Sequence, residues 1–367
     1  MRQVWDLAVV GAGPAGTAAA IAAAARGASV LLLEKAEVPR YKRCGGGLIG
    51  PSQRVLADLG VAIPALDTCG RFTFTHEGGK AFTRTAAPFL PMVVRSQLDA
   101  QLVALAQSHG AELRTGATVG AYGEEDGVVT LGTSSGPVWA RSVVAADGST
   151  SRASAYVGVR CDLVDIGFEA ELPRPAGSDW DGHVLLDWGP VPGSYGWVFP
   201  KGDTLTVGVI GSRDAGTEMR DYYRSFVASL GLDLSTALVD GGHQTRVRAP
   251  GSPLQRGQVM VTGDAGGLLE PWTREGISFA LRSGRLAGLA AVGAVPSYPD
   301  AVAAELGAEV AAGRRALQVF TRRPGVVHRV MRTRPLWPLL QELVSGRTTM
   351  ADQLERRRVR WLVRLVE

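Results

Sequence analysis

The chain has 367 residues, of which 46% are hydrophobic and 20% are charged, and its formal net charge is +4. These values exclude a mainly disordered protein and allow a large buried core. The length predicts two or three structural units. The small positive charge does not by itself predict nucleic-acid binding, and no nucleic-acid motif accompanies it, so we expect no nucleic-acid partner.

The cysteine content is low, and the three residues, Cys44, Cys69 and Cys161, show no Cys-x-x-Cys spacing. An odd set of this kind disfavours a disulfide framework or a zinc site, so we expect no metal and a reducing, cytoplasmic compartment. The pattern of a signal peptide is absent from the start of the chain. No run of about 20 apolar residues predicts a transmembrane helix.

The chain opens with the pattern of a strand–helix–strand unit. The valine-rich run from Val4 to Val10 predicts a buried parallel strand. The alanine-rich stretch from Ala15 to Ala25 predicts a helix, which ends at Arg26-Gly27. Ser29 to Leu33 predicts the second strand, and the whole has the length of about 30 residues that a dinucleotide-binding unit requires.

Between the first strand and the helix lies the glycine fingerprint Gly11-Ala12-Gly13-Pro14-Ala15-Gly16. Glycine permits a tight turn, a close approach of the backbone to pyrophosphate, and close helix–strand packing, while the helix N-terminus offers free N–H groups to phosphates. Glu34 ends the second strand, where a carboxylate can accept a ribose hydroxyl. A turn that merely packs tightly is the alternative. The predicted dinucleotide site contains Gly11, Gly13, Pro14, Ala15, Gly16, Glu34 and Lys35.

The rest of the chain alternates between strand-rich and helical stretches. Glycine, proline and basic residues from Pro39 to Pro51 predict a functional loop. The elements that follow are strands from Phe72 to Val94 with a turn at Gly78-Gly79, a helix from Ser96 to His109, strands from Ala111 to Ala145 and from Val164 to Gly211, a strand from Val259 to Thr262, a helix from Glu275 to Val292, and a largely helical remainder from Ser297.

Three later segments resemble the sequence motifs of flavoprotein hydroxylases and their relatives. Val144-Ala145-Ala146-Asp147-Gly148-Ser149 resembles the Asp-Gly motif, Thr262-Gly263-Asp264-Ala265-Gly266 the Gly-Asp motif, and Arg95 with Leu98-Asp99 the Arg-x-x-Leu-Asp helix start. The resemblance implies non-covalently bound FAD, with Asp264 on the ribityl chain and Arg95, Asp147 and Gly263 in the same site. For Asp147-Gly148 alone, an ordinary turn is the alternative.

A second set of segments is similar to the geranylgeranyl reductase family of FAD-dependent oxidoreductases. Pro39-Arg40-Tyr41-Lys42-Arg43-Cys44-Gly45-Gly46-Gly47-Leu48 is similar to its Cys-Gly-Gly-Gly loop, and Tyr195-Gly196-Trp197-Val198-Phe199-Pro200-Lys201 looks like its Tyr-x-Trp-x-Phe-Pro stretch near the substrate. Glu270-Pro271-Trp272-Thr273-Arg274-Glu275-Gly276-Ile277 resembles its flavin loop, which implies that Pro271, Gly276 and Ile277 contact the flavin. The resemblance extends from Val4 to about Val292.

One residue departs from the family pattern, because Arg274 stands where many relatives carry glycine. A bulky cation beside the flavin would change the access of the reductant or the choice of substrate. The alternative is a side chain that points to solvent, which would change neither.

The chemistry of these loops agrees with the resemblance. Consecutive glycines after Cys44 let the backbone approach a flat ring where side chains would clash. Alternation places Tyr195, Trp197 and Phe199 on one face of a strand, which suits a hydrophobic substrate or, alternatively, fills the core. We take Cys44, Gly45 and Gly46 as candidate catalytic residues, with Cys44 as a proton donor or a flavin gate; a small buried hydrophobic residue is the alternative.

Together the segments predict an α/β fold: a Rossmann-like FAD-binding domain with an inserted antiparallel β-rich substrate domain and a helical C-terminal region. The FAD-binding domain is discontinuous, because the strand-rich stretch from Val164 interrupts a pattern that resumes at Val259. We expect it to comprise residues 1–70, 93–160 and 250–295, the substrate domain residues 71–92 and 161–249, and the helical region residues 296–367.

The expected function is that of an FAD-dependent oxidoreductase of isoprenoid lipid biosynthesis. NAD(P)H or another electron donor would reduce the flavin, which would then reduce carbon–carbon double bonds of a hydrophobic prenyl lipid. A flavin-dependent monooxygenase (hydroxylase) of a hydrophobic or aromatic substrate is one alternative. A halogenase is disfavoured, because the Trp-x-Trp-x-Ile-Pro stretch of halogenases is absent. A non-catalytic lipid-binding protein that retains flavin is another alternative.

The C-terminal stretch from Arg314 to Glu367 is biased towards arginine, with 13 arginines against four acids. Such a stretch can form a basic amphipathic helix on an anionic membrane surface, which predicts peripheral membrane contact. A solvated basic face over a core-packing stripe is the alternative. The interleaved apolar residues are Trp337, Leu339, Leu340, Leu343, Trp361 and Leu362.

Overall fold

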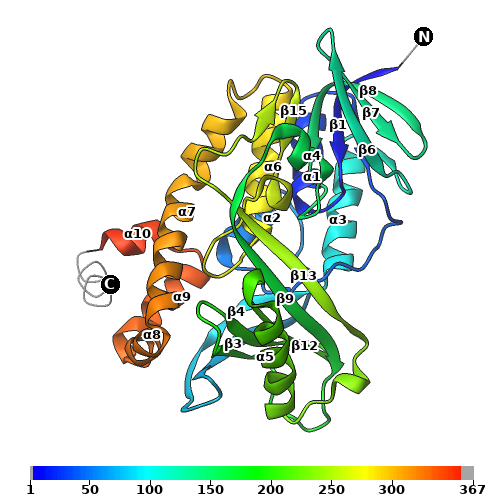
Figure 1. Ribbon diagram of the computed structural model, residues 1–367. Helices are drawn as coiled ribbons and strands as arrows, with labels where there is room; N and C mark the ends of the chain where they lie inside the picture. The colour runs from blue at the N-terminus through cyan, green and yellow to red at the C-terminus, as the bar shows by residue number, and fades with distance from the viewer. Residues whose placement is uncertain (1–2, 357–367) are drawn as a thin grey trace.

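The computed structural model describes residues 3–356, which form two β-sheets with helices packed around and between them (Figure 1). In the first sheet the parallel strands lie in the order β15-β8-β1-β2-β5. A β6–β7 hairpin joins β8, and β14 joins β15, both antiparallel. The strands are β1 (Val4–Val10), β2 (Val30–Leu33), β5 (Glu112–Arg114), β6 (Val119–Glu125), β7 (Val128–Thr133), β8 (Gly136–Ala145), β14 (Gln255–Arg256) and β15 (Val259–Val261).

Helix α1 (Pro14–Ala24) is buried over its whole length, between this sheet and helix α6 (Ile277–Ala291). The two helices approach closely because α6 presents glycines to α1. An added Cβ at Gly284 would come 2.0 Å from the carbonyl oxygen of Ala15, and one at Gly288 would come 2.2 Å from that of Ala19. The alanines of α1 therefore act as spacers as well as helix formers.

The second sheet has the strand order β13-β9-β12-β11-β10-β3-β4. Its neighbouring strands are antiparallel except β3 and β10, which are parallel because the chain passes through the first sheet between them. Helix α5 (Gly216–Ser229) packs Met219, Tyr222 and Phe226 on this sheet. The strands are β3 (Ala65–His76), β4 (Phe82–Val93), β9 (Cys161–Pro173), β10 (His183–Trp188), β11 (Tyr195–Lys201), β12 (Thr204–Ser212) and β13 (Val239–Arg248).

The fold class is the one expected from the sequence, with a single parallel pair in the otherwise antiparallel sheet. The segment of the second sheet begins at Ala65, before the expected residue 71, because β3 extends further towards the N-terminus than its apolar pattern. With that change we propose the division into an FAD-binding domain, a substrate domain and a C-terminal region given above. The remaining shorter helices are α2 (Gly50–Asp58), α3 (Arg95–Ser108), α4 (Arg152–Val157), η1 (Arg213–Ala215), η2 (Leu234–Thr236) and η3 (Gly263–Gly266).

The C-terminal helices lie along one side of both sheets (Figure 1). Helix α7 begins in the core of the first sheet at Tyr298 and reaches the core of the second at Phe320. Trp337 packs on Phe72 of β3, with 5.6 Å between the ring centroids, and Leu340 joins the same cluster. These helices are α7 (Tyr298–Arg322), α8 (Pro324–Met331), η4 (Arg334–Leu336), α9 (Trp337–Val344) and α10 (Met350–Glu355).

For Trp337 and Leu340 the structure therefore supports the core-packing alternative and not insertion into a bilayer. Trp361 and Leu362 lie outside the described residues. Across residues 3–356, the structure contains no helix with the length and apolar character needed to cross a membrane.

Candidate functional site

A cavity of about 1150 Å³ is lined by residues of both sheets and of the C-terminal helices. It exceeds the roughly 300–1,000 Å³ typical of small-molecule pockets, so it has room for a dinucleotide and a second ligand. Most of the predicted site residues lie on its wall: Gly11, Gly13, Pro14, Ala15, Glu34, Lys35, Cys44, Gly45, Gly46, Arg95, Asp147, Tyr195, Trp197, Phe199, Asp264, Gly276 and Ile277. Gly16, Gly263 and Pro271 are not among the residues that line it.

One end of the cavity is formed by the glycine fingerprint. Gly11 has a φ of 98°, and an added Cβ would come 2.5 Å from the carbonyl oxygen of Ala146. A Cβ at Gly16 would come 1.8 Å from the carbonyl oxygen of Gly11. Helix α1 has Gly13 as its N-cap and no side-chain cap, so its first N–H groups stay available to a ligand.

Two guanidinium groups face this helix N-terminus. Nitrogens of Arg40 and Arg95 each lie 3.7 Å from the position that a Cβ of Gly13 would take. Asp99 accepts from both arginines, at 2.8 and 2.9 Å from Arg95 and at 2.9 Å from Arg40. A second carboxylate, Glu34, pairs with Arg40 at 3.1 Å. A glycine cradle, free N–H groups and two fixed guanidinium groups fit the pyrophosphate of a dinucleotide.

Two carboxylates are placed for the sugar portions of such a ligand. Glu34 is 4% exposed, and its oxygens accept from the backbone N–H groups of Ala12 at 2.9 Å and Ala36 at 3.2 Å. Asp147 accepts from the backbone N–H of Arg152 at 3.2 Å, while its other oxygen is buried without a partner in the described residues. Burial raises the pKa of Asp147. An unpaired buried oxygen on the wall fits a hydroxyl donor from the ligand.

The loop around Cys44 is clamped by the second sheet. The backbone N–H of Cys44 donates to Glu169 at 3.1 Å, and its carbonyl oxygen accepts from Lys201 at 2.8 Å. Lys201 also pairs with Glu171 at 3.8 Å and is 3% exposed. Burial raises the pKa of Glu169, and the Lys201 charge opposes that effect. Neither Glu169 nor Lys201 was a predicted site residue; charged residues inside a buried strand are the signal that would have indicated them.

The Cys44 loop lies directly against the aromatic residues of β11. An added Cβ at Gly45 would come 2.7 Å from the ring of Phe199 and 3.7 Å from Nε1 of Trp197. The rings of Tyr195, Trp197 and Phe199 follow one another at centroid distances of 5.9 and 6.2 Å. The glycines therefore allow close contact between loop and rings. A catalytic role for Cys44, Gly45 and Gly46 stays a prediction.

Arg274 does not point to solvent. Its side chain is 4% exposed, and its Nε donates to Asp165 of β9 at 2.9 Å. The guanidinium carbon lies 5.6 Å from the ring centroid of Tyr195. The φ of Arg274 is 57°, a left-handed conformation that favours glycine. The solvent-pointing alternative is wrong, because the ion pair with Asp165 draws the side chain inward and ties the 270–276 loop to the second sheet.

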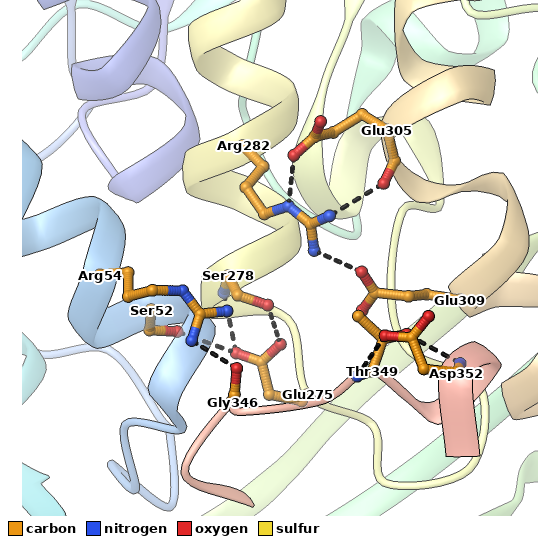
Figure 2. A network of polar contacts seen from close by, with 10 residues as sticks. All are labelled: Ser52, Arg54, Glu275, Ser278, Arg282, Glu305, Glu309, Gly346, Thr349 and Asp352. Carbon is orange, nitrogen blue, oxygen red and sulfur yellow. Dashed lines mark hydrogen bonds and ion pairs between the residues drawn. The ribbon is translucent and has the colours of Figure 1, made fainter. Parts of the chain in front are cut away.

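A polar network connects this loop with α2 and the C-terminal helices (Figure 2). Glu275 accepts from the backbone N–H of Ser278 at 2.8 Å and from the hydroxyl of Ser52 at 3.3 Å, and burial raises the pKa of Glu275. Arg54 of α2 donates to the carbonyl oxygen of Gly346 at 2.6 Å. Arg282 of α6 binds Glu305 and Glu309 of α7, each at 2.9 Å. The C-terminal wall of the cavity is thus anchored to the first sheet's helices.

The end of the cavity away from the fingerprint is apolar. A second cavity of about 170 Å³ shares several of its residues and extends between α8, α9 and α10. An apolar space that continues from one cavity into the other suits a hydrophobic chain. The residues common to both cavities are Phe74, Trp272, Met331, Trp337, Leu340, Leu343 and Met350.

Comparison with known proteins shows related sequences and folds. Residues 5–282 match the family model described as the FAD binding domain. The chain is 33% identical over 327 residues to digeranylgeranylglycerophospholipid reductase 1 of Methanopyrus kandleri, covering 79% of this chain and 81% of that protein. It is 30% identical over 344 residues to menaquinone reductase of Mycolicibacterium smegmatis, covering 82% and 80%.

Among solved structures, the chain is similar to a geranylgeranyl bacteriochlorophyll reductase-like protein of Thermoplasma acidophilum. The TM-score is 0.76 at 21% sequence identity, and the match covers 88% of each chain. At this identity the likeness shows a shared fold.

Proposed function

We propose that this chain, which belongs to the FAD binding domain family of oxidoreductases, reduces carbon–carbon double bonds of a prenyl lipid. The observation that carries the proposal is the apolar cavity, which starts at the Cys44 loop and continues between the C-terminal helices. Two of the relatives named above support it, since one is named as a reductase of digeranylgeranylglycerophospholipid and the other as a reductase of menaquinone.

The residues present fit FAD. Bound FAD, once reduced by an electron donor, would supply a hydride for the reduction of a double bond. We propose that Arg40, Arg95 and the fingerprint hold its pyrophosphate, and that Asp264 holds the ribityl chain. Gly276 and Ile277 open helix α6 on the same wall, so the positive end of the helix dipole faces that part of the cavity.

The chain's own residues would position the substrate, exclude water from the site and supply a proton. Burial of a prenyl chain gains about 25 cal/mol per Å² of apolar surface, so the aromatic wall can hold it without polar contacts. Saturation of a double bond requires one proton for each hydride. We propose the Cys44 thiol as the donor, since Glu169 and Lys201 fix its backbone beside the β11 rings.

The test of the proposed function separates the two half-reactions under anaerobic conditions. The flavin is reduced with NAD(P)H or, if that fails, with dithionite, and the reduced enzyme is mixed with prenyl lipids or with oxygen. We expect reoxidation by a prenyl lipid with formation of a saturated chain. Rapid reoxidation by oxygen with a hydroxylated product and no saturated lipid would establish the monooxygenase alternative. An enzyme reoxidised by neither would indicate a flavin-retaining binding protein.

Asp264→Ala is expected to weaken FAD binding. Loss of one hydrogen bond to a charged group costs about 1.5–3 kcal/mol, which corresponds to roughly 10–150-fold in Kd. The Kd is measured by fluorescence titration of the apoprotein with FAD. Asp214→Ala, at an exposed position on η1, is the control and should match the wild type. An unchanged Kd in the Asp264 variant would remove this residue from the site.

We propose peripheral contact with anionic membranes through the C-terminal arginines. In and between the described C-terminal helices Arg322, Arg323, Arg329, Arg332 and Arg334 are exposed. The protein should co-sediment with vesicles that contain anionic lipid, and less so as salt rises, since charges are screened beyond about 10 Å at 0.1 M ionic strength. Absence of binding at low salt, or equal binding to neutral vesicles, would contradict the proposal.

A further inference from the structure

Two basic side chains meet on the cavity wall, and neither was among the predicted site residues. Nζ of Lys42, in the glycine-rich loop, lies 3.4 Å from Nε2 of His243 on β13. Burial and the charge of Lys42 lower the pKa of His243 to about 4, so at neutral pH the imidazole is neutral. The contact is therefore an ammonium that donates to an imidazole nitrogen, which fixes the position of the Lys42 charge.

Within residues 3–356 Lys42 forms no ion pair with a carboxylate, whereas the neighbouring Arg40 and Arg95 both do. Burial is the main cause that lowers the pKa of Lys42, and Asp264 is the main group that opposes it. The charged and titratable groups that face the pair are Arg40, Arg43 and Cys44 of the same loop, Arg95 of α3 and Asp264 of η3.

Lys42 lies among the segments that we assign to the flavin. Asp264, the start of α6 at Gly276, and the Gly45-Gly46 turn all line the same cavity as Lys42. A hydride donor of the nicotinamide class adds two electrons and one proton to oxidised flavin, so the reduced form carries one negative charge. A fixed cation in a poorly solvated cavity stabilises that charge and leaves the neutral oxidised form almost unaffected.

We propose that Lys42, held in place by His243, is a cation directed at the bound flavin that stabilises its anionic reduced form and raises its reduction potential. His243 acts through Lys42 and is a positioning residue. The proposal rests on the proposed function only in requiring bound FAD, and Lys42 gains and loses no bond in the process.

The first test measures the reduction potential of the bound flavin by anaerobic equilibration with a reference dye, with no lipid present. Lys42→Met should shift the two-electron equilibrium at least tenfold towards the oxidised form, which lowers the potential by about 30 mV. Lys42→Arg keeps the charge and should stay near the wild-type value. Lys80→Met, an exposed lysine between β3 and β4, is the matched control. A potential in Lys42→Met equal to that of the wild type overturns the proposal.

The second test follows the potential against pH in His243→Leu, so that the proposal stays testable if Lys42→Met fails to retain FAD. The contribution of the Lys42 charge to the reduction potential is present below the pKa of Lys42 and is lost as pH rises through that pKa. Without its acceptor the ammonium is less stable, so His243→Leu should lose the contribution at a lower pH than the wild type, and His243→Gln should restore the wild-type profile. Identical profiles in all three proteins overturn the proposal. Lipid reduction is measured separately, so failure of either proposal leaves the other decidable.

Discussion

Gly16→Ala is expected to yield a protein that no longer retains FAD. The new Cβ would come 1.8 Å from the carbonyl oxygen of Gly11 and 3.2 Å from Cγ1 of Val9, so helix α1 or the fingerprint turn must move. The helix cannot retreat, because Gly284 and Gly288 of α6 touch its other side. The turn must then open, which displaces the N–H groups that would face the pyrophosphate. We expect FAD affinity to fall by at least about 100-fold, or about 2.7 kcal/mol.

The measurement pairs the FAD Kd with thermal unfolding of the apoprotein, so that loss of the site is distinguished from loss of the fold. The control is Gly307→Ala, an exposed helical glycine of α7 where an added Cβ meets nothing within 4 Å. This control should bind FAD normally. Its free energy of unfolding should rise by up to about 1 kcal/mol, because alanine is favoured over glycine in a helix. A Gly16→Ala protein with wild-type affinity would show that α1 has space that the structure does not give it.

The sequence predicts those parts of the fold that depend on local patterns of residues. The apolar runs at Val4–Val10 and Val30–Leu33 become central parallel strands, since burial on both faces leaves no alternation. The close packing of α1 on α6 was not predicted. Gly284 and Gly288 lie far along the chain from Ala15 and Ala19, and a glycine in a helix pattern does not indicate which helix it will meet.

The site residues likewise fall into those that a local pattern predicts and those that depend on distant partners. The fingerprint, Glu34 and the β11 aromatics carry local signals and reach one cavity. Glu169 and Lys201 stand out in the sequence only as charged residues inside buried strands. That pattern does not indicate their partner, because each holds the backbone of Cys44, which is 125 and 157 residues away in sequence. The direction of Arg274 depends likewise on Asp165, a partner 109 residues away. Such roles follow from packing and not from motif.

Trp197→Ala is expected to reduce prenyl-lipid turnover by about 100-fold, a loss of about 2.7 kcal/mol in transition-state stabilisation, while flavin reduction by the donor changes little. Trp197 is 7% exposed at the middle of the aromatic series, beside the Gly45 position of the Cys44 loop. Its ring also covers Gly208 of β12, where an added Cβ would collide with it. Alanine would remove the surface that presses a chain towards the loop and would leave a void beside it.

The two half-reactions separate a substrate role from a structural one. Flavin reduction is followed by stopped-flow absorbance without lipid, and reoxidation by a prenyl lipid is followed anaerobically. Trp180→Ala is the matched control, because this tryptophan packs on the same sheet in the α5 cluster and does not line the cavity; it should lower thermal stability and leave both rates close to the wild type. Trp197→Phe should recover part of the reoxidation rate, since it keeps an aromatic surface. Equal losses in both half-reactions of Trp197→Ala would instead place Trp197 among the residues that support the flavin or the fold, and the path of the prenyl chain would then have to run along another part of the wall.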